Sequence, residues 1–503
     1  MEDEDVIIAS WRKSVTDIIC FAGVVYDAGY QFLLSVYQRI KQASRITLAS
    51  LREPGSFVQN FAVSFSATAA VTVIGILLTP VVSRIYPPAS YGQFAVFSSV
   101  LNNLTLITTL TLPGALLLPK TRRIFFELVN AIIALSLICT SVLFLFLLVG
   151  NDWVERRLNI PDFGPWLLLL PFIMLLANMN NVMGFWYIRE KAFRKRAGID
   201  ISTSLMGRGV TIGAGLLLHG TGLGLLFGEL ANRLTYFMGL MFSGIYRKVR
   251  LLWRVFSWRG SWEAMKAYKD FPMYVLPANY VNVLSAQVPI FMLTSKFGAT
   301  VVGLYAFSVS LLEMPLNLVG SAIAPVFMQK ATELQHTAPE RLKDITLSLY
   351  NKLLYLGLLP FGFLTVFGDV VFRVVFGAKW EMAGLFTAYL GYYYIFKLTS
   401  TVTAPLYTVI ERQRYALIST VLLLAARVSG LFIGLSLNDV NKAMLLFGLG
   451  SLIVTFLTDL HILYLLRAPV LRIAIRTVVL VALSTGLMWC LRVVLHQMIP
   501  QWI

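Results

Sequence analysis

Several charged residues interrupt long apolar stretches of this sequence. Glu229 and Arg233 stand four residues apart in one such stretch, so on a helix they share a face and can form an ion pair. Arg208 lies at a similar depth in the preceding stretch. A charge near the middle of a bilayer costs at least ~2.5 kcal/mol, so such residues face a cavity or a partner. The segment 201–245 therefore predicts a net cationic cavity within a membrane, suited to an anionic cargo.

Further charges lie deep in other apolar stretches. The bases nearest to mid-membrane are Arg208, Arg233, Lys397 and Arg427, and the acids are Glu229, Glu313 and Asp459. Arginine offers planar, bidentate donors that suit the oxygens of a diphosphate, so we expect the four bases to bind such a group in one cavity. The alternative is that these charges pair with one another as part of the structure.

The three acids are candidates for coupling to H⁺ or Na⁺, because carboxylates within membrane spans often serve as relays. For Glu229 the role of partner to Arg233 is the stronger interpretation. His461 is only two residues from Asp459 and does not share its helix face, so we interpret it as a histidine with a local hydrogen-bond partner. Among the uncharged polar residues, Asn102, Asn178 and Asn282 could contact a sugar, or could hydrogen-bond neighbouring helices.

The amino-acid composition indicates that the chain is a membrane protein. The chain is 57% hydrophobic and only 13% charged, against about 25% charged residues in a soluble protein. Its net charge of +17 comes from basic residues in short loops, which argues against nucleic-acid binding. The three cysteines are far apart, so no disulfide framework, metal site or other cofactor is predicted. The acidic start, Met1–Asp5, is unlike a cleavable signal peptide.

The elements that must position the charges are transmembrane helices of roughly 20 residues. We predict about thirteen spans by this criterion, at 57–85, 92–118, 125–149, 165–187, 201–219, 222–245, 272–297, 300–328, 347–372, 383–409, 415–437, 443–466 and 477–496. Most of the loop Lys and Arg residues fall on one side of the membrane, as in Lys120–Arg123 and 189–196. By the positive-inside rule this side is cytoplasmic, and so is the amino terminus.

The longest loop on the basic side, 246–271, divides the chain. Its Trp253, Trp258 and Trp262, mixed with Arg and Lys, predict a helix lying along the lipid headgroups, with docking of a cytosolic partner as the alternative. We expect an interfacial extension at 1–56, a first lobe at 57–245, this linker, a second lobe at 272–466 and an extra helix within 467–503. For 1–56, a mobile tail is an equal alternative and a further span a weaker one.

The two halves share a short pattern. Arg84 ends one predicted span and Gly92-Gln93-Phe94-Ala95 opens the next; Lys296 and Gly303-Leu304-Tyr305-Ala306 repeat this in the second half. Six spans separate the copies, so both would enter from the same side and the repeat is parallel. Internal repeats with a binding site at their interface are typical of transporters.

These stretches also carry a family resemblance. Ser83–Ala95 resembles the first outer turn of bacterial O-antigen and related polysaccharide-repeat flippases, and Phe271–Lys330, with Met314-Pro315-Leu316, resembles the start of their second half. These flippases belong to the polysaccharide-transport branch of the multidrug/oligosaccharidyl-lipid/polysaccharide exporter superfamily. The resemblance covers about residues 57 to 470. The extension at 1–56 and the thirteenth span depart from the commonest pattern.

The resemblance implies an all-α polytopic membrane protein with about 12–14 transmembrane helices, in two pseudo-symmetric six-helix lobes around a central cavity. It implies transport, not catalysis: movement of an undecaprenyl-diphosphate-linked oligosaccharide across the bacterial inner membrane by alternating access. The implied partners are this polyprenyl-linked cargo, membrane lipids, a polysaccharide polymerase and a chain-length regulator. The alternatives are a cation-coupled drug antiporter of the same superfamily and, more weakly, a polymerase or glycosyltransferase.

Overall fold

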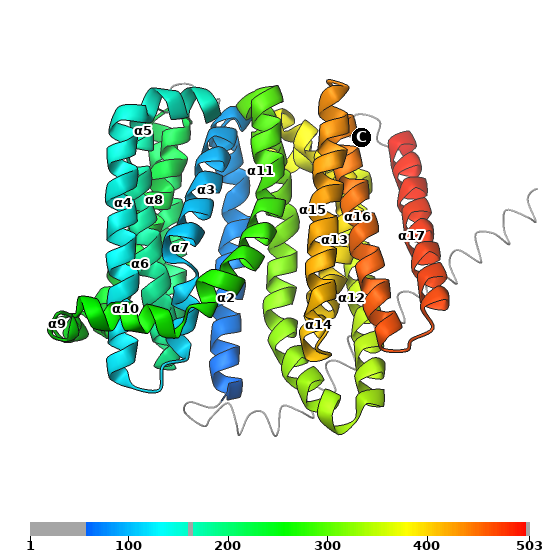
Figure 1. Cartoon of the computed structure of the whole chain (residues 1–503). Coiled ribbons are helices and arrows are strands. Elements are labelled where there is room, and N and C mark those ends of the chain that lie inside the picture. Colours follow the sequence, from blue (N-terminus) through cyan, green and yellow to red (C-terminus); the bar gives the residue numbers. More distant parts are fainter. Residues whose placement is uncertain (1–56, 159–163, 499–503) are drawn as a thin grey trace, which may run out of the picture. The chain divides into compact units, whose positions relative to one another are not determined.

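The computed structural model describes residues 57–158 and 164–498, and every element in these ranges is a helix (Figure 1). The predictions for 1–56 lie outside the described residues. The longer helices are α2 (Phe57–Ile85), α3 (Pro88–Thr109), α4 (Arg122–Leu158), α6 (Leu170–Arg189), α7 (Phe193–Leu217), α8 (Gly222–Leu240), α9 (Tyr246–Val255), α10 (Trp258–Ala267), α11 (Leu276–Thr337), α12 (Pro339–Val371), α13 (Glu381–Thr403), α15 (Gln413–Ser436), α16 (Val440–Leu465) and α17 (Val470–Met498). Shorter helical turns are α5 (Gly164–Leu167), α14 (Leu406–Val409), η1 (Leu112–Leu117), η2 (Met241–Ile245), η3 (Phe271–Val275), η4 (Phe372–Phe376) and η5 (Ala378–Trp380).

Each predicted span overlaps helical structure, but the span 92–118 is interrupted at Leu110 and Thr111, between α3 and η1. In the described residues, seven segments are long and apolar enough to cross a membrane: Ala62–Ile85, Arg122–Leu158, Phe271–Gly320, Pro339–Phe376, Gln413–Ser436, Val440–Leu465 and Val470–Gln497. The site residues are found in both sets of helices: Glu313, Arg427 and Asp459 lie in these apolar segments, whereas Arg208, Arg233 and Lys397 lie on other helices. The chain is therefore a multi-pass membrane protein, as the sequence predicts.

Helix α11 contains two of the predicted spans. Its backbone is interrupted at Gly298, where φ is +77° and ψ is −178°. A residue with a side chain rarely adopts this conformation, whereas glycine does so at little cost. The chain thus turns at Gly298 between the predicted spans 272–297 and 300–328, in agreement with the sequence analysis.

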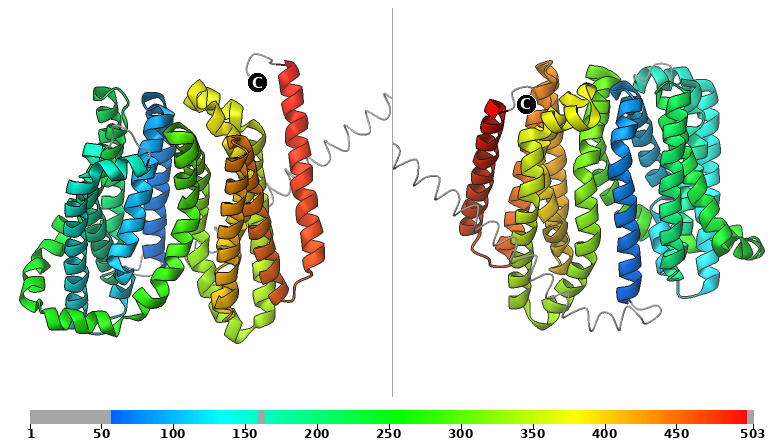
Figure 2. Two further views of the ribbon diagram at one scale, coloured as in Figure 1. Left: turned by 45° about the horizontal axis from the view of Figure 1, so that its top comes forward. Right: turned by 180° about the vertical axis from the view of Figure 1, so that it is seen from behind.

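The chain clusters into two units, Met1–Ser64 and Phe65–Ile503. Within the second unit, α3, α4, α6, α7 and α8 pack against one another and form a first group; α11, α12, α13, α15 and α16 form a second group (Figures 1 and 2). Helix α17 lies outside the second group, mainly against α12. The predicted domain boundaries at 57, 246, 272 and 467 are not tested by this division and stay predictions.

The two groups meet where α3 crosses α11. A Cβ added to Gly92 would lie 1.7 Å from the Ala299 carbonyl oxygen, and one added to Gly303 would lie 1.8 Å from the Pro88 carbonyl oxygen. The contact is reciprocal: each motif glycine meets the residue four positions before the other. Reciprocal contacts of this kind are the mark of two-fold relations. The repeated Gly-x-aromatic-Ala pattern therefore lies at a pseudo-two-fold contact between the halves.

A second set of contacts ties the same ends together. The indole Nε1 of Trp380 donates to the Ser83 carbonyl oxygen at 2.9 Å, and Lys379 Nζ donates to the Arg84 carbonyl oxygen at 3.0 Å. The Trp380 ring is fully buried, with its centroid 4.1 Å from that of Phe307 and 5.0 Å from that of Tyr91. Aromatic pairs of this geometry add to the stabilisation from burial. These contacts join the α2–α3 turn to the α12–α13 turn, and we call this end of the bundle the closed end.

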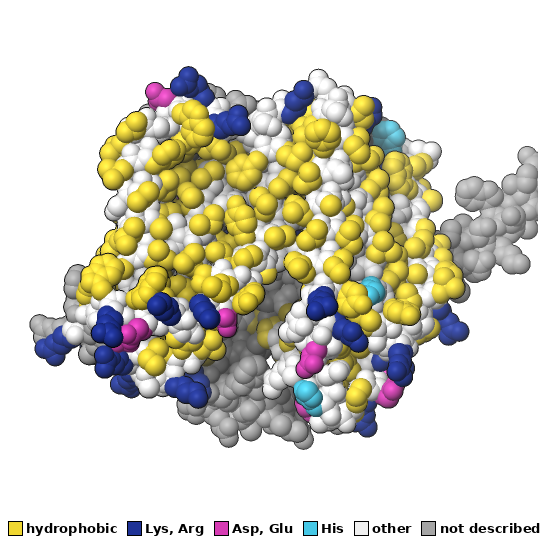
Figure 3. Space-filling model, viewed as in Figure 1, with side chains coloured by type: hydrophobic (Ala, Val, Ile, Leu, Met, Phe, Trp, Pro, Cys, Tyr) yellow, Lys and Arg dark blue, Asp and Glu magenta, His cyan; other side chains and the backbone are white. Residues whose placement is uncertain are grey.

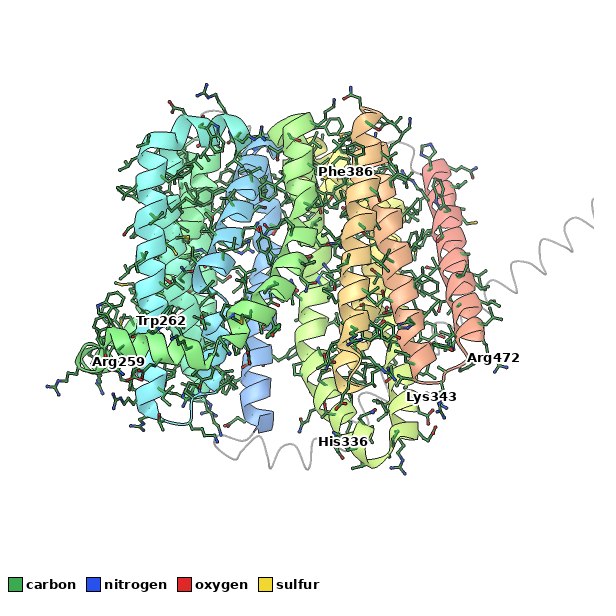
Figure 4. All side chains as sticks on the ribbon, viewed as in Figure 1. Arg259, Trp262, His336, Lys343, Phe386 and Arg472 are labelled. Carbon is green, nitrogen blue, oxygen red and sulfur yellow. The ribbon has the colours of Figure 1, made fainter. Side chains whose placement is uncertain are left out.

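The opposite end of the bundle carries the basic loops, and we call it the basic end. His336, Lys343 and Arg472 lie there, whereas Phe386 lies toward the closed end (Figure 4). Between α10 and the α11–α12 turn the surface is hollowed toward this end (Figure 3). The predicted linker 246–271 forms the helices α9 and α10. Helix α10 packs on α4 and leaves Trp258 and Trp262 exposed. Exposed tryptophans beside basic residues fit a membrane interface.

Candidate functional site

A cavity of about 790 Å³ lies between α2 and helices of the first group. Its walls come from α2, α3, α6, α7 and α8, and it is lined by three bases (Arg196, Arg208 and Arg233) and two acids (Asp200 and Glu229). Asn180, Asn181 and Asn232 add uncharged polar groups. The cavity is therefore polar, membrane-embedded and carries one more base than acid.

Four of these five charges are paired. Arg233 Nε donates to Glu229 Oε1 at 2.6 Å, and Arg196 Nε lies 3.9 Å from Asp200 Oδ2. Both pairs are spaced i, i+4 on one helix, which brings the side chains together. For Arg233 the structural interpretation of the sequence analysis therefore applies, since Glu229 is its partner.

Arg208 is the remaining base. Among the described residues, its side chain makes no hydrogen bond and no ion pair. It reaches from α7 toward α2, where a Cβ on Gly75 would lie 3.0 Å from Arg208 Nη2 and 3.9 Å from Met314 Cε of α11. The guanidinium therefore packs closely against the backbone of Gly75. The excess positive charge of the cavity is thus the half-buried guanidinium of Arg208, which makes no hydrogen bond to the described residues.

A second cavity, of about 370 Å³, lies within the second group and is walled by α11, α13, α15 and α16. Here Lys397 Nζ of α13 donates to Glu313 Oε1 of α11 at 2.7 Å and lies 4.9 Å from the centre of the Tyr394 ring. The four predicted bases are therefore split between two cavities, two in each. The expectation that they line one cavity is wrong for these pockets, because the helices that carry them belong to different groups.

Arg427 also borders the second cavity, but its donors are used by the protein. Its guanidinium donates to Ser451 Oγ at 3.2 Å, to the carbonyl oxygen and Oγ of Ser285 at 3.0 Å each, and to the Tyr393 hydroxyl at 2.6 Å. These partners lie on α16, α11 and α13, and the residue is only 7% exposed. Arg427 of α15 therefore braces four helices, and these hydrogen bonds favour a structural role over its predicted role in cargo binding.

The predicted asparagines have different environments. Asn178 is fully buried and donates to Thr108 Oγ1 at 3.1 Å and Ser136 Oγ at 3.2 Å, so it joins helices and lines neither cavity. Asn102 is exposed and lies in neither cavity, whereas its neighbour Asn103 bonds Gln287 of α11. Asn282 does line the second cavity and donates to the Ala278 carbonyl oxygen of its own helix.

Two predicted residues lie below the second cavity, toward the basic end. Asp459 is fully buried, and among the described residues it forms no ion pair. His461 Nδ1 lies 2.7 Å from the Tyr407 hydroxyl, in agreement with a histidine that has a local partner. The sequence analysis missed Arg196 and Asp200, although their i, i+4 spacing was a usable signal. It also missed Asn232, because a helix that is apolar on most sides does not show from its sequence which residues face a cavity.

The sequence of the first group and of much of the second matches a known family. Residues 81–384, more than half of the chain, match the family model described as "Polysaccharide biosynthesis protein". The chain belongs to the polysaccharide biosynthesis protein family. A curated relative, the succinoglycan biosynthesis transport protein ExoT of Rhizobium meliloti (strain 1021), is 25% identical over 307 residues. The aligned part is 60% of this chain and 59% of ExoT, so the chain spans about three fifths of that relative.

Solved structures share the fold of this family member. The lipid II flippase MurJ in an inward closed conformation aligns with a TM-score of 0.62 at 11% identity, over 87% of this chain and 99% of MurJ. An inward-facing multidrug resistance MATE transporter of the MOP superfamily aligns with a TM-score of 0.55 at 14% identity, over 84% and 99%. A MOP superfamily transporter from Pyrococcus furiosus gives 0.54 at 15% identity, over 83% and 97%. At these identities the likeness concerns the fold, which is the one expected from the sequence.

Proposed function

We propose that this protein is a flippase that moves a polyprenyl-diphosphate-linked oligosaccharide, such as the repeat unit of an O-antigen, capsule or exopolysaccharide. Membership of the polysaccharide biosynthesis protein family supports a polysaccharide-related role, and the name of the relative ExoT supports transport. The fold shared with MurJ and MATE transporters supports alternating access. Movement runs from the basic end, which the positive-inside rule makes cytoplasmic, to the other leaflet of the inner membrane.

The observation that carries the proposal is the unpartnered guanidinium of Arg208 in the first cavity. A charge held inside a membrane without a protein partner is costly, and an arriving diphosphate would remove that cost. Guanidinium donors match diphosphate oxygens in a bidentate geometry. The neighbouring amides of Asn180, Asn181 and Asn232 offer donors and acceptors for sugar hydroxyls. The polyprenyl tail would remain in the lipid while the head crosses.

The rival function is a cation-coupled drug antiporter, which the MATE fold supports. Such a protein needs an available carboxylate for a cationic substrate. In the two cavities, Asp200, Glu229 and Glu313 each have a basic partner, and the spare charge is a base. The charge balance therefore favours an anionic cargo over a cationic one.

The proposal is tested in the organism that makes the polysaccharide. In a strain without its own copy of the gene, Arg208→Ala should abolish surface polysaccharide and Arg208→Lys should restore part of it, because Lys keeps the charge without the planar fork. Arg414→Ala, which removes an exposed arginine of α15, is the matched control and should behave like the wild type. Membrane levels of each variant are measured by immunoblot. Full polysaccharide production by Arg208→Ala would remove the proposal.

A further inference from the structure

The buried carboxyl group of Asp459 stands apart from the charged pairs of the two cavities. It lies on α16, six residues before the helix ends at Leu465, or about 9 Å from the basic end of the helix at 1.5 Å per residue. It is fully buried, while Glu229 and Glu313 are partly exposed and ion-paired. The described residues offer it no cation.

Two hydroxyl groups of α13 hold this carboxyl. Thr403 Oγ1 donates to Asp459 Oδ1. Thr399 Oγ1 lies 2.6 Å from Asp459 Oδ2 and 2.9 Å from the carbonyl oxygen of Phe396. Thr399, Thr403 and Asp459 are all fully buried. The contact between α13 and α16 is thus polar at this one level.

The protons can be counted. A threonine hydroxyl has one proton to donate and lone pairs to accept. The Thr399 hydroxyl lies within donor reach of both the Phe396 carbonyl oxygen and Asp459 Oδ2, but its single proton serves one of them at a time. If the proton goes to Phe396, the 2.6 Å contact with Asp459 Oδ2 is a hydrogen bond only when the carboxyl group is protonated. A protonated Asp459 satisfies every partner: Oδ2–H donates to Thr399, Thr399 donates to Phe396, and Thr403 donates to Oδ1.

An ionised Asp459 would draw the proton of Thr399 away from the Phe396 carbonyl oxygen. A negative charge would then stand in a buried helix contact, held by two hydroxyl groups and by no cation among the described residues. The 2.6 Å between Thr399 Oγ1 and Asp459 Oδ2 is a hydrogen-bond distance, so a proton holds these two oxygens together. The arrangement therefore fits a proton.

The groups around Asp459 do not supply a counter-charge. Tyr350 of α12 and Tyr407 of α14 lie within electrostatic reach of the carboxyl. On α15, Tyr415 packs against His461, with ring centroids 4.8 Å apart, and Arg427 is bound to Ser285, Ser451 and Tyr393. On α17, Arg476 donates to the Tyr355 hydroxyl. Tyr407 and His461, joined by a hydrogen bond, lie between Asp459 and the basic end.

We propose that Asp459, with Thr399 and Thr403, is a proton-binding site of the second group of helices, loaded from the basic end past Tyr407 and His461. Uptake of one proton neutralises the carboxylate and completes the hydrogen-bond chain between α13 and α16. Release of that proton leaves a buried charge and loosens the same contact. The site thereby links proton occupancy to the packing of two helices that wall the second cavity.

The first test does not depend on what the protein transports. Infrared spectra of the full chain at neutral pH, in a detergent without carbonyl groups, report the C=O stretch of protonated carboxyl groups, which ionised carboxylates lack. Asp459→Asn keeps both hydrogen bonds, through its oxygen and its NH₂ group, and should lose this band. Glu313→Gln, which replaces an ion-paired carboxylate, is the matched control and should retain it. A band unchanged in Asp459→Asn would overturn the site.

A second measurement on the wild type covers the case in which Asp459→Asn does not fold. Dicyclohexylcarbodiimide reacts with protonated carboxyl groups in apolar surroundings, and peptide mass spectrometry locates the adduct. We expect modification at Asp459 that disappears at alkaline pH, and none at Glu229 or Glu313. Equal modification of all three would contradict a selectively protonated Asp459.

A third measurement rests on the proposed flippase function. In proteoliposomes, Asp459→Asn should bind undecaprenyl diphosphate as the wild type does, and its transport should no longer respond to a pH gradient. If the wild type does not bind undecaprenyl diphosphate either, the result would count against the flippase function and not against the proton site. A wild-type response to the pH gradient that Asp459→Asn retains would show that the proton acts elsewhere.

Discussion

The brace around Arg427 yields a stability prediction that can be worked from the structure. Arg427→Met keeps the length of the side chain and removes hydrogen bonds to Ser285, Ser451 and Tyr393 on three neighbouring helices. Hydrogen bonds between membrane helices contribute about 0.6 kcal/mol on average and up to about 1.7, so four of them are worth roughly 2–7 kcal/mol. Allowing for the desolvation of the buried guanidinium, we expect a loss of about 3 kcal/mol.

The assay is thermal unfolding in detergent, followed by intrinsic fluorescence. If the second group of helices, Leu276–Leu465, unfolds cooperatively, a loss of about 3 kcal/mol lowers Tm by roughly 6–12 °C. Arg427→Lys should fall between, because Lys keeps the charge and cannot reach all three partners. Arg414→Met, the same substitution at an exposed position of α15, should leave Tm within about 1 °C. An unchanged Tm in Arg427→Met would refute the bracing role and would return Arg427 to the candidates for cargo binding.

Two further predictions concern the closed end. Gly303→Ala places a methyl group 1.8 Å from the Pro88 carbonyl oxygen, so it should separate α3 from α11, lower Tm by several degrees and reduce transport. The control is Gly486→Ala of α17, where a Cβ meets nothing within 4 Å, and it should be neutral or slightly stabilising. Equal effects of the two substitutions would contradict the close crossing of α3 and α11. Asp439 caps α16, and the backbone N–H groups of Lys442 and Asn441 that donate to it hold the pKa of this carboxyl below its ordinary value. The stabilisation by the ionised Asp439 carboxylate is therefore present at neutral pH and lost as the pH falls through its lowered pKa. The difference in Tm between the wild type and Asp439→Ala should narrow in acid. A Tm difference that does not depend on pH would show that the charge of Asp439 does not contribute to the cap.

The sequence is sufficient for the helices and for local pairs. Apolar runs of span length predict the long helices, the Gly298 region predicts the division of α11, and i, i+4 spacing predicts the pair of Glu229 and Arg233. The parallel repeat follows from the pattern around Gly92 and Gly303, although their mutual contact does not. In each case the decisive interaction lies within a few residues along the chain.

Long-range partners are different. Glu313 and Lys397 are 84 residues apart, and Arg427 bonds a residue 142 positions away. Helices that are apolar on every side give no periodic signal for which face meets which neighbour. For that reason the sequence placed Arg208 and Arg427 together as cargo ligands, whereas the structure leaves the first with free donors and surrounds the second with acceptors. For the same reason the sequence left two roles open for Asn178, sugar contact or hydrogen bonding between helices, and the structure shows the second.

The central claim, that the spare guanidinium of Arg208 recognises a diphosphate, is tested most directly by native mass spectrometry of lipid binding. Undecaprenyl diphosphate and undecaprenol share the tail and differ in the head, so their comparison isolates the anion. A charge-assisted bidentate contact of about 1.5–3 kcal/mol corresponds to roughly 10- to 150-fold in affinity. We predict that the wild type and Arg414→Ala prefer the diphosphate by this factor and that Arg208→Ala loses the preference. An undiminished preference in Arg208→Ala would contradict the account.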